Sequence, residues 1–247
     1  MAETETEPNP SIPEQLFHTV LTVIDYHADT SGSTQDVYVL GTHTTLRAAK
    51  AFALSALQQL GYQRDDFATY ATRADLPPDQ NQEWPHGDGV MVYAKAPKGQ
   101  EFLVSLDTKP NTESLPASSA GDDTLLLPER CDHLHYVLQT KTDYNQDKSG
   151  AFQETEIQGC YVSRAAALAA AKRVLVSEEN GISREDYAQY DERDGEEGEE
   201  EEEEAGWPFG EDVYVHAVAQ TGENYTVAVK TPPGARRKLG KCRGEGV

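Results

Sequence analysis

The second half of this chain repeats its first half, and that repeat limits the possible folds more than any other feature. An offset of 118 residues brings Asp25 onto Asp143, and short insertions in the second copy keep the later positions aligned. A repeat of this size is typical of one folding unit encoded twice. We therefore expect two copies of one module. The polar and aromatic residues kept in both copies are Asp25, Tyr26, Arg64, Asp66, Tyr70 and Trp84, which match Asp143, Tyr144, Arg184, Asp186, Tyr190 and Trp207.

Each copy begins with two segments of alternating character. Leu16, Val20 and Ile24 occupy every second or fourth position of the first segment, and Leu134 and Leu138 repeat this pattern. Alternation with a period of two indicates a strand with one buried face. A Gly/Ser-rich turn and a second alternating segment follow in both copies, and this arrangement predicts a pair of antiparallel strands.

A helix follows the second strand of each copy. Thr44 or Thr45 and, in the second copy, Ser163 are the expected N-caps, because their hydroxyl groups can accept a hydrogen bond from a free backbone N–H. Small and apolar residues then recur at helical spacing. They are Leu46, Ala49, Ala53, Leu57 and Leu60 in the first copy, and Ala167, Ala171 and Leu175 in the second.

The last part of each copy predicts a hairpin. Residues 90–96 pair with 102–106, and residues 213–219 with 225–229, around turns at Gly99 and Gly222. Between helix and hairpin, the shared pattern R-x-D-[FY]-A-x-Y is expected to form a short turn or helical piece. Each copy thus reads β-β-α-β-β, which predicts an α+β fold with a mainly antiparallel four-stranded sheet and one helix on one face.

The sheet face without a helix needs a cover because apolar side chains lie on it. We expect the other copy to provide this cover in a pseudo-twofold pair, and a homodimer would serve equally well. The residues assigned to this face are Phe17, Leu21, Val23, Leu40, Met91 and Tyr93 in the first copy, and Val137, Tyr214 and Val218 beside Lys141, Glu156 and His216 in the second.

The composition sets the domain boundaries. We expect a disordered acidic N-terminus over 1–12, the first module over 13–110 and the second over 129–233. The intervening linker, residues 111–128, ends near three leucines that are expected to dock on the second copy or to extend its first strand. The remaining segments are an acidic disordered insert over 191–205 and a basic flexible tail over 234–247.

The charge balance argues against several classes of partner. The chain carries 21 basic and 43 acidic residues, a formal net charge of −22. A field of this sign repels nucleic-acid backbones and anionic membrane surfaces, so we expect neither as a partner. The N-terminus has no signal-peptide pattern, and no segment is long and apolar enough to span a membrane. We expect a cytoplasmic protein, with a nuclear location as the alternative because of the basic tail.

No sequence pattern points to catalysis, to a cofactor or to a metal. His133 and His135 have the H-x-H spacing, which by itself is a weak metal signal. Cys131, Cys160 and Cys242 are far apart and lack a nucleophile motif. The twelve residues shared by the two copies are consistent with a ligand pocket. Ion pairs and aromatic caps that hold the turns explain them equally well, and the sequence favours this structural role.

These observations predict a non-enzymatic protein that acts by binding another protein. The first alternative is a small-molecule binder or enzyme with its site in the groove between the modules. The second is an acidic, chaperone-like binder of basic proteins that uses residues 191–204.

Overall fold

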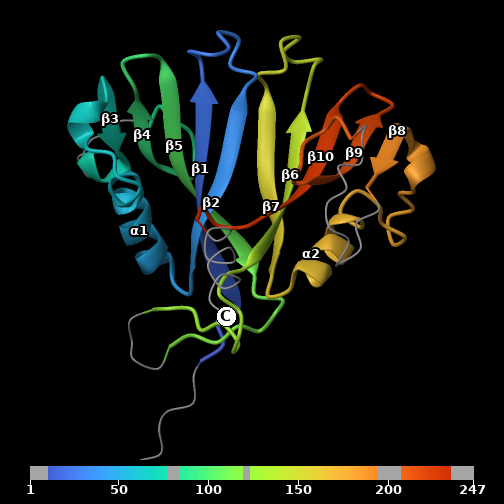
Figure 1. The fold of residues 1–247 in the computed structure, drawn as a ribbon, viewed down its shortest axis with the longest axis horizontal. Coiled ribbons are helices and arrows are strands. Elements are labelled where there is room, and N and C mark those ends of the chain that lie inside the picture. The colour runs from blue at the N-terminus through green and yellow to red at the C-terminus, as the bar shows by residue number, and fades with distance from the viewer. Residues whose placement is uncertain (1–10, 77–83, 119–122, 194–206, 235–247) are drawn as a thin grey trace, which may run out of the picture.

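The fold consists of two antiparallel five-stranded sheets, each with one α-helix (Figure 1). The computed structural model describes residues 11–76, 84–118, 123–193 and 207–234. The first module contains β1 (Gln15–Asp25), β2 (Gln35–His43), α1 (Leu46–Gln59), β3 (Thr69–Thr72), β4 (Val90–Lys95) and β5 (Gln100–Pro110). The second contains β6 (His135–Thr142), β7 (Gln153–Tyr161), α2 (Arg164–Ala171), β8 (Tyr187–Glu192), β9 (Val213–Ala219) and β10 (Asn224–Lys230).

The two sheets have the same strand order, as the sequence repeat predicts. The orders are β2-β1-β5-β4-β3 and β7-β6-β10-β9-β8, so each strand of the first sheet has a counterpart in the second. The prediction of four strands was wrong by one strand in each module. The segment after the helix forms a short 3₁₀ turn, Arg64–Asp66 or Arg184–Asp186, and then continues into β3 or β8.

The predicted hairpins and helix caps are present. Gly99 and Gly222 lie in the hairpin turns with φ values of 108° and 99°, a backbone region that favours glycine. The Thr45 hydroxyl accepts a hydrogen bond from the backbone N–H of Ala48, and Ser163 caps α2 in the same way. Of the two threonines considered for the first cap, Thr45 is therefore the one used.

The alternation along the strands was read correctly, but several residues were assigned to the wrong sheet face. Tyr93, His216 and Val218 do lie on the face without a helix, because their strand neighbours Val92, Val215 and Ala217 pack on the helix side. Leu21 and Met91, assigned to the face without a helix, are buried in one cluster with the α1 residues Ala53 and Leu57. Val23 and Leu40 are partly buried against the same cluster, and Val137 and Tyr214 pack likewise with the α2 residues. Both faces of the first strand carry apolar residues, so a period of two separates the faces without showing which one meets the helix.

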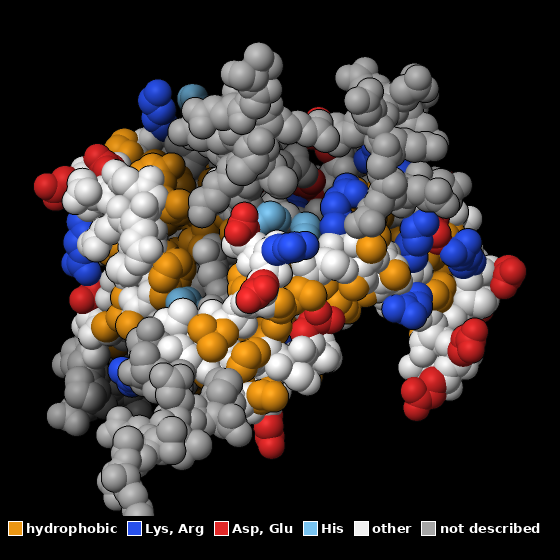
Figure 2. Space-filling view, turned by 60° about the horizontal axis from the view of Figure 1, so that its bottom comes forward, with side chains coloured by type: hydrophobic (Ala, Val, Ile, Leu, Met, Phe, Trp, Pro, Cys, Tyr) orange, Lys and Arg blue, Asp and Glu red, His pale blue; other side chains and the backbone are white. Residues whose placement is uncertain are grey.

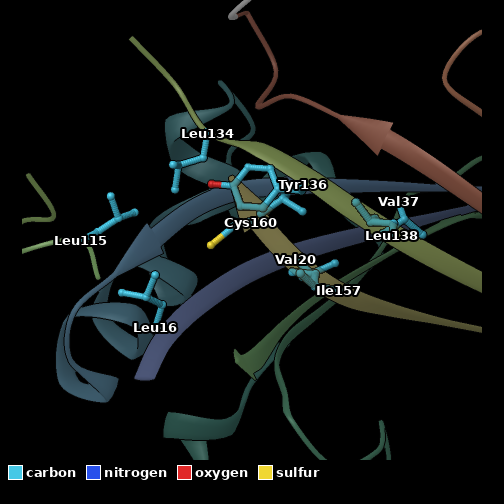
Figure 3. Packing of buried hydrophobic residues seen from close by; sticks show 10 residues of the cluster. Leu16, Val20, Val37, Leu115, Leu134, Tyr136, Leu138, Ile157 and Cys160 are labelled. Atoms are coloured by element: carbon cyan, nitrogen blue, oxygen red, sulfur yellow. The ribbon is translucent and has the colours of Figure 1, made fainter. Parts of the chain in front are cut away.

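The opposite faces of the two sheets pack against each other and form a third core (Figure 3). Leu16 and Val20 of β1 and Val39 of β2 lie in one cluster with Leu138 of β6 and Ile157 of β7. The molecule therefore has four layers, with the helices on the outside and the two sheets in contact (Figure 1). Each module covers the other, as the sequence predicts, but through the face that was expected to meet the helix.

Hydrogen bonds across the junction follow the same pseudo-twofold relation. The side-chain amide of Gln35 donates to the carbonyl of Ala151 at 2.9 Å. That of Gln153, its counterpart in the second copy, donates to the carbonyl of Ser33 at 2.8 Å. Ser33 and Ala151 are themselves counterparts, so the pair of bonds is reciprocal. This is the pattern of a two-fold interface, in which one surface patch meets its own copy.

The inner edges of the two sheets are also bonded across the junction. Asp107 of β5 accepts a hydrogen bond from the backbone N–H of Ile157 in β7 at 3.1 Å. Lys230 of β10, the counterpart of Asp107, donates to the backbone carbonyl of Val37 in β2 at 3.1 Å. The acidic Asp107 thus accepts from a backbone N–H of the edge strand β7, and the basic Lys230 donates to a backbone carbonyl of the edge strand β2.

The segment between the modules contributes to this core. Leu115 is buried in the junction cluster, and Leu125 and Leu127 are partly buried against it. The predicted docking of these leucines is thus present. Asp191 and Glu192, which we placed in the acidic insert, belong to β8. The rest of that insert except Arg193, together with residues 1–10 and 235–247, lies outside the described residues.

Candidate functional site

The twelve shared residues lie at three places in each module. The first is the turn between the first two strands, where the Asp25 carboxylate accepts hydrogen bonds from the backbone N–H groups of His27 and Ala28. Asp143 does the same for its own turn. The Tyr26 ring packs on Gly32, where an added Cβ would lie only 2.6 Å from the ring, and Tyr144 packs on Gly150 in the same way.

The second place is the turn after the helix. The Asp66 carboxylate accepts a hydrogen bond from the backbone N–H of Gln63 and closes the 3₁₀ turn. The Arg64 guanidinium lies 4.7 Å from the centre of the Tyr70 ring, a cation–π contact. The second module repeats both contacts. Asp186 caps Ser183, and Arg184 lies 5.3 Å from the centre of the Tyr190 ring.

The third place precedes β4 and β9. Trp84 packs edge-on against His86, which stacks on Tyr93 at a centroid distance of 3.9 Å. In the second module Trp207 packs against Phe209, which stacks on His216 at 3.8 Å. Each stacked pair contains one histidine. In the first module it is His86, before β4, and in the second it is His216, within β9.

The shared residues thus hold turns and cap strands, each within its own module. None of the twelve lines either of two cavities that lie between the modules. The arrangement favours the structural role that the sequence analysis preferred for them.

The larger cavity, which we call the junction pocket, lies where both modules meet the segment that connects them. Its volume is about 610 Å³, within the range of small-molecule sites. Figure 2 looks toward this end of the molecule, where histidine side chains lie beside hydrophobic ones. The described residues that line the pocket are Gly41, Thr42, His43, Ala48, Asp123, Thr124, Leu125, Leu127, Asp132, His133, Leu134, Tyr136, Pro232, Pro233 and Gly234.

A chain of buried hydrogen bonds lies at one end of this pocket. The Thr42 hydroxyl is 2.8 Å from Nδ1 of His18 and 2.8 Å from the hydroxyl of Tyr136. His18 is fully buried and Tyr136 is 2% exposed. Burial lowers the pKa of His18 to about 4 and raises the pKa of Tyr136. Both side chains are therefore uncharged at neutral pH, and the bonds join the first module to the second.

His43 borders the pocket, but its ring packs against Phe52 of α1 at a centroid distance of 4.9 Å, on the face of β2 opposite to Thr42. Its Nε2 is buried and has no hydrogen-bond partner among the described residues. Burial also lowers the pKa of this side chain, so its ring is neutral at neutral pH. This nitrogen is buried on the helix side of β2, so it is not part of the pocket wall that Thr42 and Tyr136 form. We call Thr42 and Tyr136 the polar end of the junction pocket.

The equivalent position in the second module is built differently. Tyr161 stands in place of His43, and its ring lies over Gly159, where an added Cβ would be 2.8 Å from the hydroxyl oxygen. Cys160 stands in place of Thr42 and is buried. Burial raises the pKa of the Cys160 thiol to about 12, so the thiol remains protonated at neutral pH. The polar end thus belongs to one side of the pseudo-twofold relation.

The smaller cavity lies beside the junction between β1, β5 and β7 and measures about 390 Å³. Its lining includes Asp88, Asp107, Lys109 and Glu156, with Val20 and other core residues behind them. Lys109 pairs with Asp107 at 3.7 Å, and Asp107 also binds the edge of β7. Asp107 thus takes part in holding the modules together.

Two further sequence features can be placed in the structure. The His133 and His135 rings lie 5.0 Å apart, centre to centre. Within the described ranges, no group of three or more His, Cys, Asp or Glu residues is arranged to hold a metal ion. None of the helices in the described part of the chain is long and apolar enough to cross a membrane.

Sequence reasoning missed His18, Thr42 and Tyr136 as a set. One signal was available, because His18 and Tyr136 occupy matching positions of the two copies between the apolar residues Leu16 and Val20, or Leu134 and Leu138. Their contact depends on how the two modules pack. The repeat predicts that they pair, but it does not predict which residues meet. Comparison with known proteins adds nothing to this description, since no protein-family model, curated protein or solved structure matches the chain.

Proposed function

We propose that this protein is a non-enzymatic binder of a small molecule, which it holds in the junction pocket between its two modules. This corresponds to the first alternative left open by the sequence. The observation that carries the proposal is the pocket itself, with its volume of about 610 Å³ and the hydrogen-bonded hydroxyl groups of Thr42 and Tyr136 at one end. Mainly apolar pockets with a few convergent polar groups are the usual form of small-molecule sites.

The position of the pocket supports the proposal further. Ligand sites often lie where two structural units meet. Both modules and the connecting segment contribute to this lining, so the site exists only in the assembled chain. The binding of a protein partner, which the sequence analysis preferred, remains a prediction.

A pair of matched variants tests the proposed function. Ala48 lines the pocket, and its counterpart Ala166 is absent from the lining. Ala48→Trp should fill the pocket, whereas Ala166→Trp adds the same bulk at the equivalent place of α2. We expect native mass spectrometry of protein from its natural source to detect an additional small mass on the wild type and on A166W, but not on A48W. A wild type without such a mass, or an A48W variant that keeps it, would contradict the proposal.

A further inference from the structure

The lining of the junction pocket indicates the chemistry of its ligand, provided that the proposed function holds. Away from the polar end, the apolar side chains of the lining are Ala48, Leu125, Leu127, Leu134, Pro232 and Pro233. Apolar ligand surface that is buried against such residues leaves water, which favours binding. The body of the ligand should therefore be hydrocarbon or aromatic.

The polar end can form a hydrogen bond with an uncharged group. A hydroxyl group can donate or accept, and a neutral imidazole nitrogen does one or the other according to its tautomer. The hydrogen bonds from Thr42 to His18 and Tyr136 join groups of this kind. The direction of donation along this chain can therefore adjust to a ligand hydroxyl, carbonyl or amine.

The same end disfavours charge of either sign. Burial lowers the pKa of a base, His18, and raises that of an acid, Tyr136. Each of these pKa shifts means that the surroundings of the side chain favour its uncharged form. The carboxylate of Asp123, which also lines the pocket, is paired with Arg47, and Asp132 would repel an anionic ligand.

From this geometry we infer that the junction pocket takes an uncharged, mainly apolar small molecule whose hydrogen-bonding group is directed at Thr42 and Tyr136. The apolar lining selects the body of the ligand, and the polar end sets its orientation. Uncharged molecules should be preferred over anionic molecules of the same shape.

Two fluorescent dyes with the same aromatic framework test this inference on the full chain. N-phenyl-1-naphthylamine is uncharged and carries one N–H group, whereas 8-anilinonaphthalene-1-sulfonate adds a sulfonate. We expect saturable binding of the uncharged dye and at least tenfold weaker binding of the anionic one. A48W should abolish binding of the uncharged dye, and A166W should leave it unchanged. Tyr136→Phe, which keeps the ring, should weaken binding about fivefold, while Tyr70→Phe in the first module should have no effect.

The outcomes separate the ligand class from the existence of the site. Equal affinities for the two dyes would overturn the preference for uncharged ligands, while sensitivity to A48W would still support the pocket as a site. Dye binding that A48W leaves intact would place the dye elsewhere and overturn the inference. If neither dye binds, the inference is wrong, and the additional mass on the natural protein then decides separately whether the pocket holds a ligand.

Discussion

His18 and Tyr136 illustrate how a fused pair differs from two identical subunits. They occupy the same position of the two copies, and their rings meet edge to face at a centroid distance of 5.7 Å. In a homodimer a residue close to the two-fold axis must meet its own copy. Here the two positions hold different side chains, and the hydroxyl of Thr42 links them. The junction thus contains one set of hydrogen bonds from His18 through Thr42 to Tyr136. In a symmetric dimer, every such bond would occur twice.

The buried imidazole of His18 makes stability depend on pH. Its pKa is lowered from 6.5 to about 4 in the folded protein, mainly by burial, so between these values the unfolded chain binds more protons than the folded chain. Stability should therefore fall as the pH falls from about 6.5 to about 4, by up to about 3 kcal/mol from this group. Below pH 4 the contribution should level off.

Urea denaturation of wild type and His18→Gln between pH 7 and pH 4 measures this effect. We expect the variant to be less stable at pH 7, because it loses the packing against Tyr136, and to show a shallower loss of stability in acid. His27→Gln changes an exposed histidine and should follow the wild-type profile. Parallel pH profiles for wild type and His18→Gln would contradict the assignment.

The two helices are equivalent in position but unequal in length. α1 has 14 residues and α2 has 8, yet both begin at a hydroxyl cap and both cover the outer face of a sheet. Three buried residues of α2, Ala167, Leu168 and Ala171, pack against the second sheet. A helix of about two turns is unstable alone, so its cap and its packing have to stabilise it.

Removal of each cap should measure how far the helices depend on it. Thr45→Ala and Ser163→Ala should each lower the free energy of unfolding by about 1 kcal/mol, because the backbone N–H of Ala48 or Ala166 loses its acceptor. The loss should be at least as large for the shorter α2. Ser55→Ala, in the middle of α1, serves as a control and should be neutral or stabilising, since alanine has the higher helix propensity. Chemical denaturation followed by circular dichroism compares the three, and a stable Ser163→Ala variant would show that packing alone holds α2.

At the scale of the whole molecule, the two modules form the equivalent of a dimer within one chain. The third core, the reciprocal glutamine bonds and the edge contacts of Asp107 and Lys230 all lie between the modules. A surface of this kind has the apolar centre and surrounding polar contacts that are typical of stable subunit interfaces. The connecting segment adds Leu115 to the same core.

Cutting the chain between the modules should leave them associated. We expect protein with a protease site placed within residues 119–122 to elute after cleavage as a complex of both halves in size-exclusion chromatography with light scattering. The same cleavage in Ile157→Asp, which places a carboxylate in the junction core, should release the halves. Separation of the unaltered halves would show that the connection, rather than the interface, holds the modules together.

Much of this architecture could be predicted from the sequence because the repeat supplies every pattern twice. The strands, helices, caps and turn glycines followed from periodicity and turn chemistry. The fifth strand did not, because Thr69–Thr72 has only four residues and its counterpart, β8, lacks a regular apolar alternation. Residues of β1 were assigned to the wrong face because this strand carries apolar residues on both sides.

The candidate site was less predictable than the fold. His18 and Thr42 are 24 residues apart, and Thr42 and Tyr136 are 94 apart. Their contacts exist only after the modules have packed together. The leucines of the connecting segment were recognised as candidates for docking, but their place in the lining of a pocket depends on the path of that segment, which no periodic pattern encodes.

If the junction pocket takes a ligand as proposed, the difference between Thr42 and Cys160 predicts one binding site per chain. Two identical subunits would present any off-axis site twice, and occupation of one copy could influence the other. In this chain Cys160 stands in place of Thr42, and the segment that completes the lining occurs once. A calorimetric titration should therefore reach saturation at one equivalent per chain along a hyperbolic isotherm, without cooperativity.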